Sequence, residues 1–145
     1  MNAKNFFNKQ EKEKIVQAIK DAEKETSGEI RVHLESRCKT EPLDRAVKIF
    51  QKLKMHRTEL RNGTIIYLAV NDRKFAIFGD QGINEKVPEN FWDDIRENMQ
   101  RHFKQGAFVA GLTQGIEAIG RKLKTYFPYQ SDDVNELSDE ISMDD

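Results

Sequence analysis

The chain has 145 residues, of which 37% are hydrophobic and 34% are charged, and its formal net charge is −1. This composition predicts a folded domain with a hydrophobic core and excludes a disordered or fibrous chain. No apolar run approaches the roughly 20 residues that span a bilayer, and residues 1–7 lack the apolar stretch of a signal peptide. The single cysteine, Cys38, excludes an internal disulfide. It suits a reducing compartment, so we expect a cytoplasmic protein.

The small net charge conceals an uneven distribution along the chain. Residues 130–145 contain seven acidic residues and no lysine or arginine. The first 129 residues hold 18 acidic and 24 basic residues, which gives them a charge of +6. Because the acidic stretch has few apolar residues to offset the entropy of ordering, we expect it to be a disordered tail. The predicted organisation is therefore one domain over 1–129 and an acidic tail over 130–145.

The first half of the chain alternates between helical and strand patterns. Asn8 with Glu11 three residues later predicts a capping box at the start of a helix. Residues 29–35 alternate apolar and polar side chains, which predicts a half-buried strand. Pro42 suits the first turn of a second helix. Residues 64–70 are apolar almost throughout, which is typical of a central strand covered on both faces.

The second half continues with a hairpin and two helices. Residues 71–73 have the character of a short turn, and residues 74–78 return as an antiparallel strand. A third helix is expected from about Pro88, and a fourth from Phe108 to Phe127. The order α-β-α-β-β-α-α makes the first two strands parallel, because a helix connects them by a right-handed crossover. We therefore predict an α/β fold with a small mixed sheet between helices on both faces.

The loop Gly79-Asp80-Gln81-Gly82 follows the returning strand directly. In the predicted topology this loop lies at the same sheet edge as the start of the first strand, and the third helix begins nearby. Acids gathered at one edge repel each other unless a cation or basic residues neutralise them. This placement predicts a divalent-cation site. The candidate ligands are Glu29, Asp80, Glu89, Asp93 and Asp94.

Carboxylate ligands favour a hard cation over zinc. Calcium takes about six to eight oxygen ligands, whereas magnesium keeps more of its waters. The lone Cys38 and three scattered histidines lack the ligand spacing of zinc sites. We therefore expect calcium as the first choice and magnesium as the second.

Each candidate ligand also has a structural explanation. Glu29 fits the exposed face of an alternating strand, and Asp80 fits a turn position that bonds its own backbone. Glu89, Asp93 and Asp94 fit the first turns of a helix, where acids interact favourably with the helix dipole. Asp93 and Asp94 point in different directions, so at most one of them is a direct ligand. The sequence leaves both explanations open.

Four stretches in chain order carry a resemblance to a known family. They are Thr26–Ile30, Asn62–Lys74, Gly79–Gly82, and Phe103–Phe108 with Gly111-Leu112. Over residues 5–127 the chain resembles the TPM domain, the family of thylakoid lumen repair proteins, their bacterial relatives and an animal receptor-auxiliary protein. The resemblance implies an α/β sandwich with a mixed sheet of about four strands, three of which are identified above. It also implies an acidic cation-binding pocket, usually for calcium.

The resemblance has departures that bear on function. Typical relatives have an export signal before the domain and a membrane span or glycine-rich tail after it, and this sequence shows neither. Glu89 stands where many relatives have an aspartate. Roles in the maintenance of membrane complexes therefore transfer poorly to this chain.

Three functions are consistent with the sequence. We expect a soluble, non-enzymatic interaction or regulatory module that binds a divalent cation and an unidentified protein partner. The alternative is a metal-assisted acid phosphatase acting on phosphomonoesters, an activity attributed to a plant relative, but no nucleophile–base pair stands out. The third is nucleic-acid binding by the basic body, for which no recognised motif is present.

Overall fold

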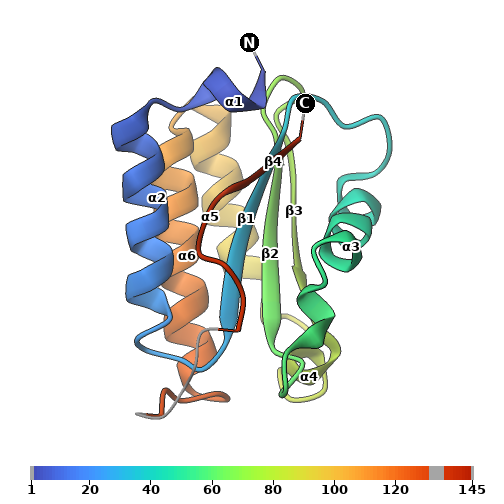
Figure 1. The fold of residues 1–145 in the computed structure, drawn as a ribbon, viewed down its shortest axis with the longest axis vertical. Coiled ribbons are helices and arrows are strands. Elements are labelled where there is room, and N and C mark those ends of the chain that lie inside the picture. The colour runs from blue at the N-terminus through green and yellow to red at the C-terminus, as the bar shows by residue number, and fades with distance from the viewer. Residues whose placement is uncertain (1, 131–135, 145) are drawn as a thin grey trace.

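A computed structural model describes residues 2–130 and 136–144 (Figure 1). The helices and strands in chain order are α1 (Ala3–Phe6), α2 (Lys9–Ala22), β1 (Glu29–Glu35), α3 (Pro42–Lys52), the 3₁₀ helix η1 (Met55–Arg57), β2 (Gly63–Ala69), β3 (Lys74–Gly79), α4 (Gln81–Asn84), α5 (Asp93–Lys104), α6 (Phe108–Lys124) and β4 (Ser142–Asp144). Within the described residues, no helix combines the length and the apolar character needed to cross a bilayer.

The sheet has four strands in the order β3-β2-β1-β4. Strands β1 and β2 are parallel, and β3 returns antiparallel to β2, as the sequence pattern predicts. The register sets Glu29 opposite Gly63 and Thr64 opposite Gly79. The start of β1, the start of β2 and the end of β3 therefore lie at the same end of the sheet.

Helices cover both faces of the sheet, which confirms the predicted sandwich. Helices α2, α5 and α6 form a layer on one face, and α3 packs on the other (Figure 1). The alternation of β1 divides its side chains between the two sides. Ile30, Val32 and Leu34 are fully buried in the larger core beneath α2, α5 and α6. A smaller core under α3 contains Ile49, Tyr67 and Ala76, among other residues.

The structure confirms the predicted starts of α2 and α3. Asn8 caps α2 by accepting from the Glu11 amide, and the Glu11 side chain accepts from the Asn8 amide. Pro42 occupies the first turn of α3. The third predicted helix is corrected at its start. Helix α5 begins at Asp93 rather than near Pro88, and the short helix α4 lies between β3 and the segment that contains Pro88.

The acidic end of the chain differs from the expectation of disorder. Residues 136–144 lie along the body, and Ser142–Asp144 pair with His33–Glu35 of β1 as a parallel edge strand. The segment gains order because Ile141 and Met143 pack against the larger core and Leu137 packs against the smaller one. This edge strand is the fourth strand of the sheet. Residues 131–135 of the predicted tail lie outside the described residues.

Close packing explains the second glycine of the Gly79-Asp80-Gln81-Gly82 loop and generates a prediction. A Cβ at Gly82 would lie 2.6 Å from the Arg61 carbonyl oxygen and closer still to that of Leu60. Because backbone cannot move aside cheaply, we expect Gly82→Ala to lower the free energy of unfolding by about 3 kcal/mol. Gly106 has open space but a positive φ of 78°, so Gly106→Ala should cost only about 1 kcal/mol. Urea denaturation measures both, and equal losses would contradict the packing explanation.

Candidate functional site

Strand β1 presents a stripe of polar side chains on its α3 side: Glu29, Arg31, His33 and Glu35. Three of the four are buried, with Glu29 4% exposed, His33 1% and Glu35 5%. Residues 136–144 contribute polar partners at both ends of this stripe. Buried ionisable groups are costly unless they are paired or neutralised, so the partners of these side chains decide what the stripe does.

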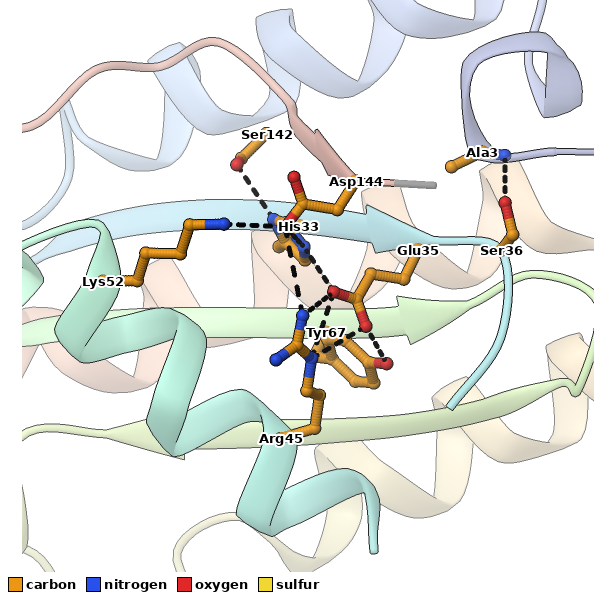
Figure 2. A network of polar contacts seen from close by, with 9 residues as sticks. All are labelled: Ala3, His33, Glu35, Ser36, Arg45, Lys52, Tyr67, Ser142 and Asp144. Atoms are coloured by element: carbon orange, nitrogen blue, oxygen red, sulfur yellow. Dashed lines mark hydrogen bonds and ion pairs between the residues drawn. The ribbon is translucent and has the colours of Figure 1, made fainter. Parts of the chain in front are cut away.

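At the end of β1 the stripe is neutralised by the protein itself (Figure 2). The Glu35 carboxylate accepts from Arg45 Nε at 2.9 Å and from the Tyr67 hydroxyl at 2.7 Å, and Arg45 Nη2 binds its second oxygen. Burial acts to raise the pKa of Glu35, but the bonds from Arg45 and Tyr67 outweigh it and lower that pKa. Burial and the bond to Glu35 raise the pKa of Tyr67. Glu35 is therefore an ionised, fully engaged acceptor.

His33 connects Glu35 to the C-terminal segment. Its Nε2 lies 3.4 Å from Glu35 and its Nδ1 lies 2.9 Å from the Ser142 hydroxyl. Burial lowers the pKa of His33 despite the nearby carboxylates of Glu35 and Asp144. A neutral ring must donate from Nε2, because a carboxylate only accepts, so Nδ1 accepts from Ser142. The row Ser142, His33, Glu35 has the residue types of a hydrolase triad, but the carboxylate is already bound by Arg45 and Tyr67.

His33, Glu35 and Asp144 also form a group with metal-binding residue types. One ligand atom from each lies within 4.8 Å of the others. Two basic side chains already compensate these acids, since Arg45 binds Glu35 and Lys52 Nζ lies 3.3 Å from Asp144. A cation at this point would compete with both. We therefore interpret the group as the anchor of β4.

At the start of β1 the stripe meets a row of acids. Glu23, the C-cap of α2, accepts from the Ile30 amide at 3.0 Å. Its carboxyl is a hydrogen-bond neighbour of both Glu29 and Asp139. Glu29 in turn accepts from the Glu136 amide at 2.7 Å. Glu23 thus lies between a carboxyl of β1 and a carboxyl of the C-terminal segment, and we call Glu23, Glu29 and Asp139 the carboxyl row. Among the described residues, the group whose ligand atoms all lie within 4.8 Å of one another is His33, Glu35 and Asp144 rather than this row.

The carboxyl row lacks the compensation found at the other end of β1. Among the described residues, no lysine, arginine or histidine forms an ion pair with any of its members. Burial, the hydrogen bond to Asp139 and the charge of Glu29 raise the pKa of Glu23, and burial raises the pKa of Glu29 although its hydrogen bonds act to lower it. Two oxygens, Glu29 Oε2 and Asp139 Oδ1, are buried without a donor from the described part of the chain. Two carboxyls bond to each other only when one is protonated, so the row needs a proton or a cation.

Among the sequence-predicted ligands, Asp80 lies where it was predicted, at the end of the sheet where β1 and β2 begin. Its amide donates to Gly63 at 2.9 Å, and the Glu29 amide donates to Asn62 at 3.2 Å, so Glu29 and Asp80 flank the start of β2. The Asp80 carboxylate accepts from Arg61 Nε at 2.8 Å and Nη2 at 3.0 Å, and it caps α4 through the Gln81 amide. Its hydrogen-bonding capacity is therefore taken up within the protein.

The other three predicted ligands lie on the surface. Glu89, Asp93 and Asp94 are exposed, and Asp93 pairs with Arg96 at 2.8 Å. Within residues 2–130 and 136–144, no hydrogen bond or ion pair joins any of these acids to Glu29 or Asp80. Of the five predicted ligands, the structure thus places Glu29 alone in the carboxyl row.

The sequence patterns do not single out Glu23 or Asp139. Glu23 follows the last residue of a helix, where acids are common on the surface, and Asp139 lies in a stretch with the composition of a disordered tail. For Glu23 the available signal is the short connection from the end of α2 to the start of β1 at Glu29. Such a connection keeps the C-terminus of the helix close to the start of the strand. Asp139 had no local signal.

The protein is an α/β sandwich in which the acidic C-terminal segment forms the edge strand beside β1. Comparison with protein families assigns the chain to a family, since the model of the TPM domain matches residues 1–122. The chain belongs to the TPM domain family, which confirms the resemblance found in the sequence.

Solved structures agree with this assignment. The NMR structure of the BA42 protein from the psychrophilic bacterium Bizionia argentinensis is 50% identical, matches 97% of each chain and has a TM-score of 0.92. The N-terminal domain of the cg2496 protein from Corynebacterium glutamicum shares the fold, with a TM-score of 0.65 at 17% identity over 80% of this chain and 73% of that one. A search of curated proteins finds no match.

The role of Asp80 generates a prediction about stability. Its side chain is 5% exposed and holds both Arg61 and the first turn of α4. Because Asp80→Ala removes the cap and the charge-assisted bonds, we expect a loss of about 2–3 kcal/mol in the free energy of unfolding. Asp93→Ala, which removes an exposed pair, should cost less than about 0.5 kcal/mol. Chemical denaturation tests this, and an unchanged stability for Asp80→Ala would contradict the structural role.

The raised pKa of Glu23 generates a prediction about pH. A carboxyl whose pKa is raised by folding stabilises the protein fully below its unfolded pKa of about 4.3, and the contribution is lost as pH rises towards the folded pKa. Glu23→Gln imitates the protonated acid at every pH. In EDTA we therefore expect the variant to match the parent protein at pH 4 and to be more stable at pH 8, with a difference growing by at most about 1.4 kcal/mol per pH unit. Glu25→Gln, an exposed neighbour, is the control. A stability difference independent of pH would contradict the assignment.

Proposed function

We propose that this TPM domain binds a divalent cation, with calcium preferred, at the carboxyl row of Glu23, Glu29 and Asp139, and acts as a non-enzymatic regulatory or interaction module. The observation that supports this most strongly is the buried Oε2 of Glu29, which has no donor from the described residues and lies beside Glu23, itself a neighbour of Asp139. A buried carboxylate oxygen without a donor is expensive. A cation would satisfy it without protonation.

The chemistry of the row suits a hard cation. Its ligands are all oxygens, which calcium accepts at about 2.3–2.6 Å in flexible geometries. The row lies at the C-terminal end of α2, where the helix carbonyls add partial negative charge. Glu23, Glu29 and Asp139 would supply the carboxylates, and water or carbonyl oxygens the remaining positions. Magnesium demands stricter octahedral geometry and gives up its waters reluctantly, so calcium is the better fit.

The proposed ligand set keeps one of the five residues expected from the sequence. Glu29 belongs to it, whereas Asp80 is engaged by Arg61 and Asp93 by Arg96. Glu89, before α5, and Asp94, in the first turn of α5, are exposed and lie outside the proposed set. The set gains Glu23 from α2 and Asp139 from the C-terminal segment, so the proposed site joins elements that are distant in the sequence.

This set of ligands gives a bound cation a regulatory role. Asp139 belongs to the segment that completes the sheet, and the Glu136 amide of the same segment bonds to Glu29. A cation held by Glu23, Glu29 and Asp139 would therefore tie the segment to the body. A phosphatase, the alternative function, also needs a nucleophile or an activated water near the cation. Among the described residues, no side-chain hydroxyl forms a hydrogen bond with the carboxyls of Glu23, Glu29 or Asp139, so we propose binding alone.

Calcium titration tests the proposal. We expect saturable binding with a dissociation constant on the order of 10⁻⁴ M, followed by amide NMR shifts that centre on residues 22–30 and 136–140. Because Glu29 is the buried member of the row, Glu29→Gln should weaken binding at least tenfold, a loss of about 1.4 kcal/mol. Asp93→Asn should leave the affinity unchanged.

Three results would count against this site. Shifts centred on residues 79–94 would favour the site expected from the sequence instead. An unchanged affinity in Glu29→Gln, with the fold intact by NMR, would remove the carboxyl row from consideration. The absence of any shift at millimolar calcium would remove the cation-binding proposal itself.

A further inference from the structure

Residues 136–144 show what the outer edge of β1 accepts. Their main-chain pairing with β1 covers three residues, Ser142–Asp144 against His33–Glu35. Ile141 and Met143 pack against the larger core, while Ser142 and Asp144 meet the polar stripe. The edge therefore accepts an extended strand in which apolar residues alternate with acidic or hydroxyl residues.

The charges along this edge favour an acidic strand. The Asp144 carboxylate lies 3.3 Å from Lys52 Nζ, 3.7 Å from His33 Nε2 and 4.0 Å from Arg45 Nη2 (Figure 2). Beyond the end of β1 lies a cavity of about 380 Å³. Its lining includes Arg37, Lys39 and Arg45. A longer acidic strand running parallel to β1 would meet these additional basic side chains.

The edge also holds a donor that residues 136–144 leave unsatisfied. Arg31 Nε is buried and has no hydrogen-bond partner in the described part of the chain. Burying such a donor costs free energy that an acceptor would recover. A strand with a suitably placed acid or carbonyl would therefore fit the polar stripe better than the protein's own segment does.

We propose that the outer edge of β1 is a docking site for an extended acidic peptide from another protein chain, and that residues 136–144 occupy it as an internal competitor. Addition of a strand to a sheet edge obtains affinity from main-chain hydrogen bonds and specificity from alternate side chains. The internal strand competes at an effective concentration in the millimolar range, but its three-residue pairing makes it displaceable. The proposal names a partner class for the interaction role above and depends on β1 rather than on the cation.

The test uses the full chain and a synthetic peptide with the sequence of residues 136–144, titrated in EDTA so that the cation site plays no part. Asp144→Lys reverses the charge that meets Lys52, His33 and Arg45, and should release the internal strand. Because apparent affinity scales with the fraction of open sites, we expect this variant to bind the peptide at least about tenfold more tightly than the parent chain. Amide shifts should centre on residues 29–35 and on Lys52.

A matched control makes the same charge change elsewhere in the segment. Glu140 is exposed, and among the described residues no ion pair joins its side chain to β1, so Glu140→Lys should bind the peptide as the parent chain does. A peptide that itself carries Asp144→Lys should fail to bind any of the three proteins. Equal affinity of the parent chain and Asp144→Lys for the unmodified peptide, no binding to either, or shifts away from β1 would each overturn the proposal.

Discussion

Strand β1 is buried on both sides although every second residue in it is polar or charged. On one side, Ile30, Val32 and Leu34 pack into the larger core. The other carries Glu29, Arg31, His33 and Glu35 along a line where the protein must supply partners, because buried charges without partners destabilise a fold. Helix α3, which packs on β2 and β3, supplies Arg45, β2 supplies Tyr67, and residues 136–144 supply the Ser142 hydroxyl and the Glu136 amide. The polar stripe therefore accounts for the ordering of an acidic segment.

The two ends of the stripe meet this requirement in opposite ways. At Glu35, basic and hydroxyl donors outweigh the effect of burial and hold the pKa low. At Glu29, no basic side chain of the described residues offsets burial, and burial raises the pKa. The first arrangement is complete within the protein and acts as an anchor, whereas the second still needs a positive charge. On this account the C-terminal segment joins the two ends, since it contributes Asp144 to the anchor and Asp139 to the carboxyl row.

Much of the fold was predictable because local rules decided it. Strict alternation located β1 at residues 29–35, and the capping box located the start of α2. The edge strand β4 was missed because the average composition of the acidic stretch hides a short alternation, Ile141 to Asp144. The site was predicted only in part. Topology placed Glu29 and Asp80 at one end of the sheet. The partner of Asp80 is Arg61, however, which lies 19 residues earlier in the loop before β2, and no local pattern reveals such a pair.

In the proposed function, the carboxyl row holds a proton until a cation replaces it. Calorimetric titration of calcium at pH 7, repeated in buffers with different ionisation enthalpies, measures the protons released on binding. We expect release of a substantial fraction of a proton per calcium bound, and a smaller release in Glu23→Gln, because metal binding requires deprotonated carboxylates. Calcium binding without proton release would contradict it, since the ligands would then be carboxylates that were already ionised.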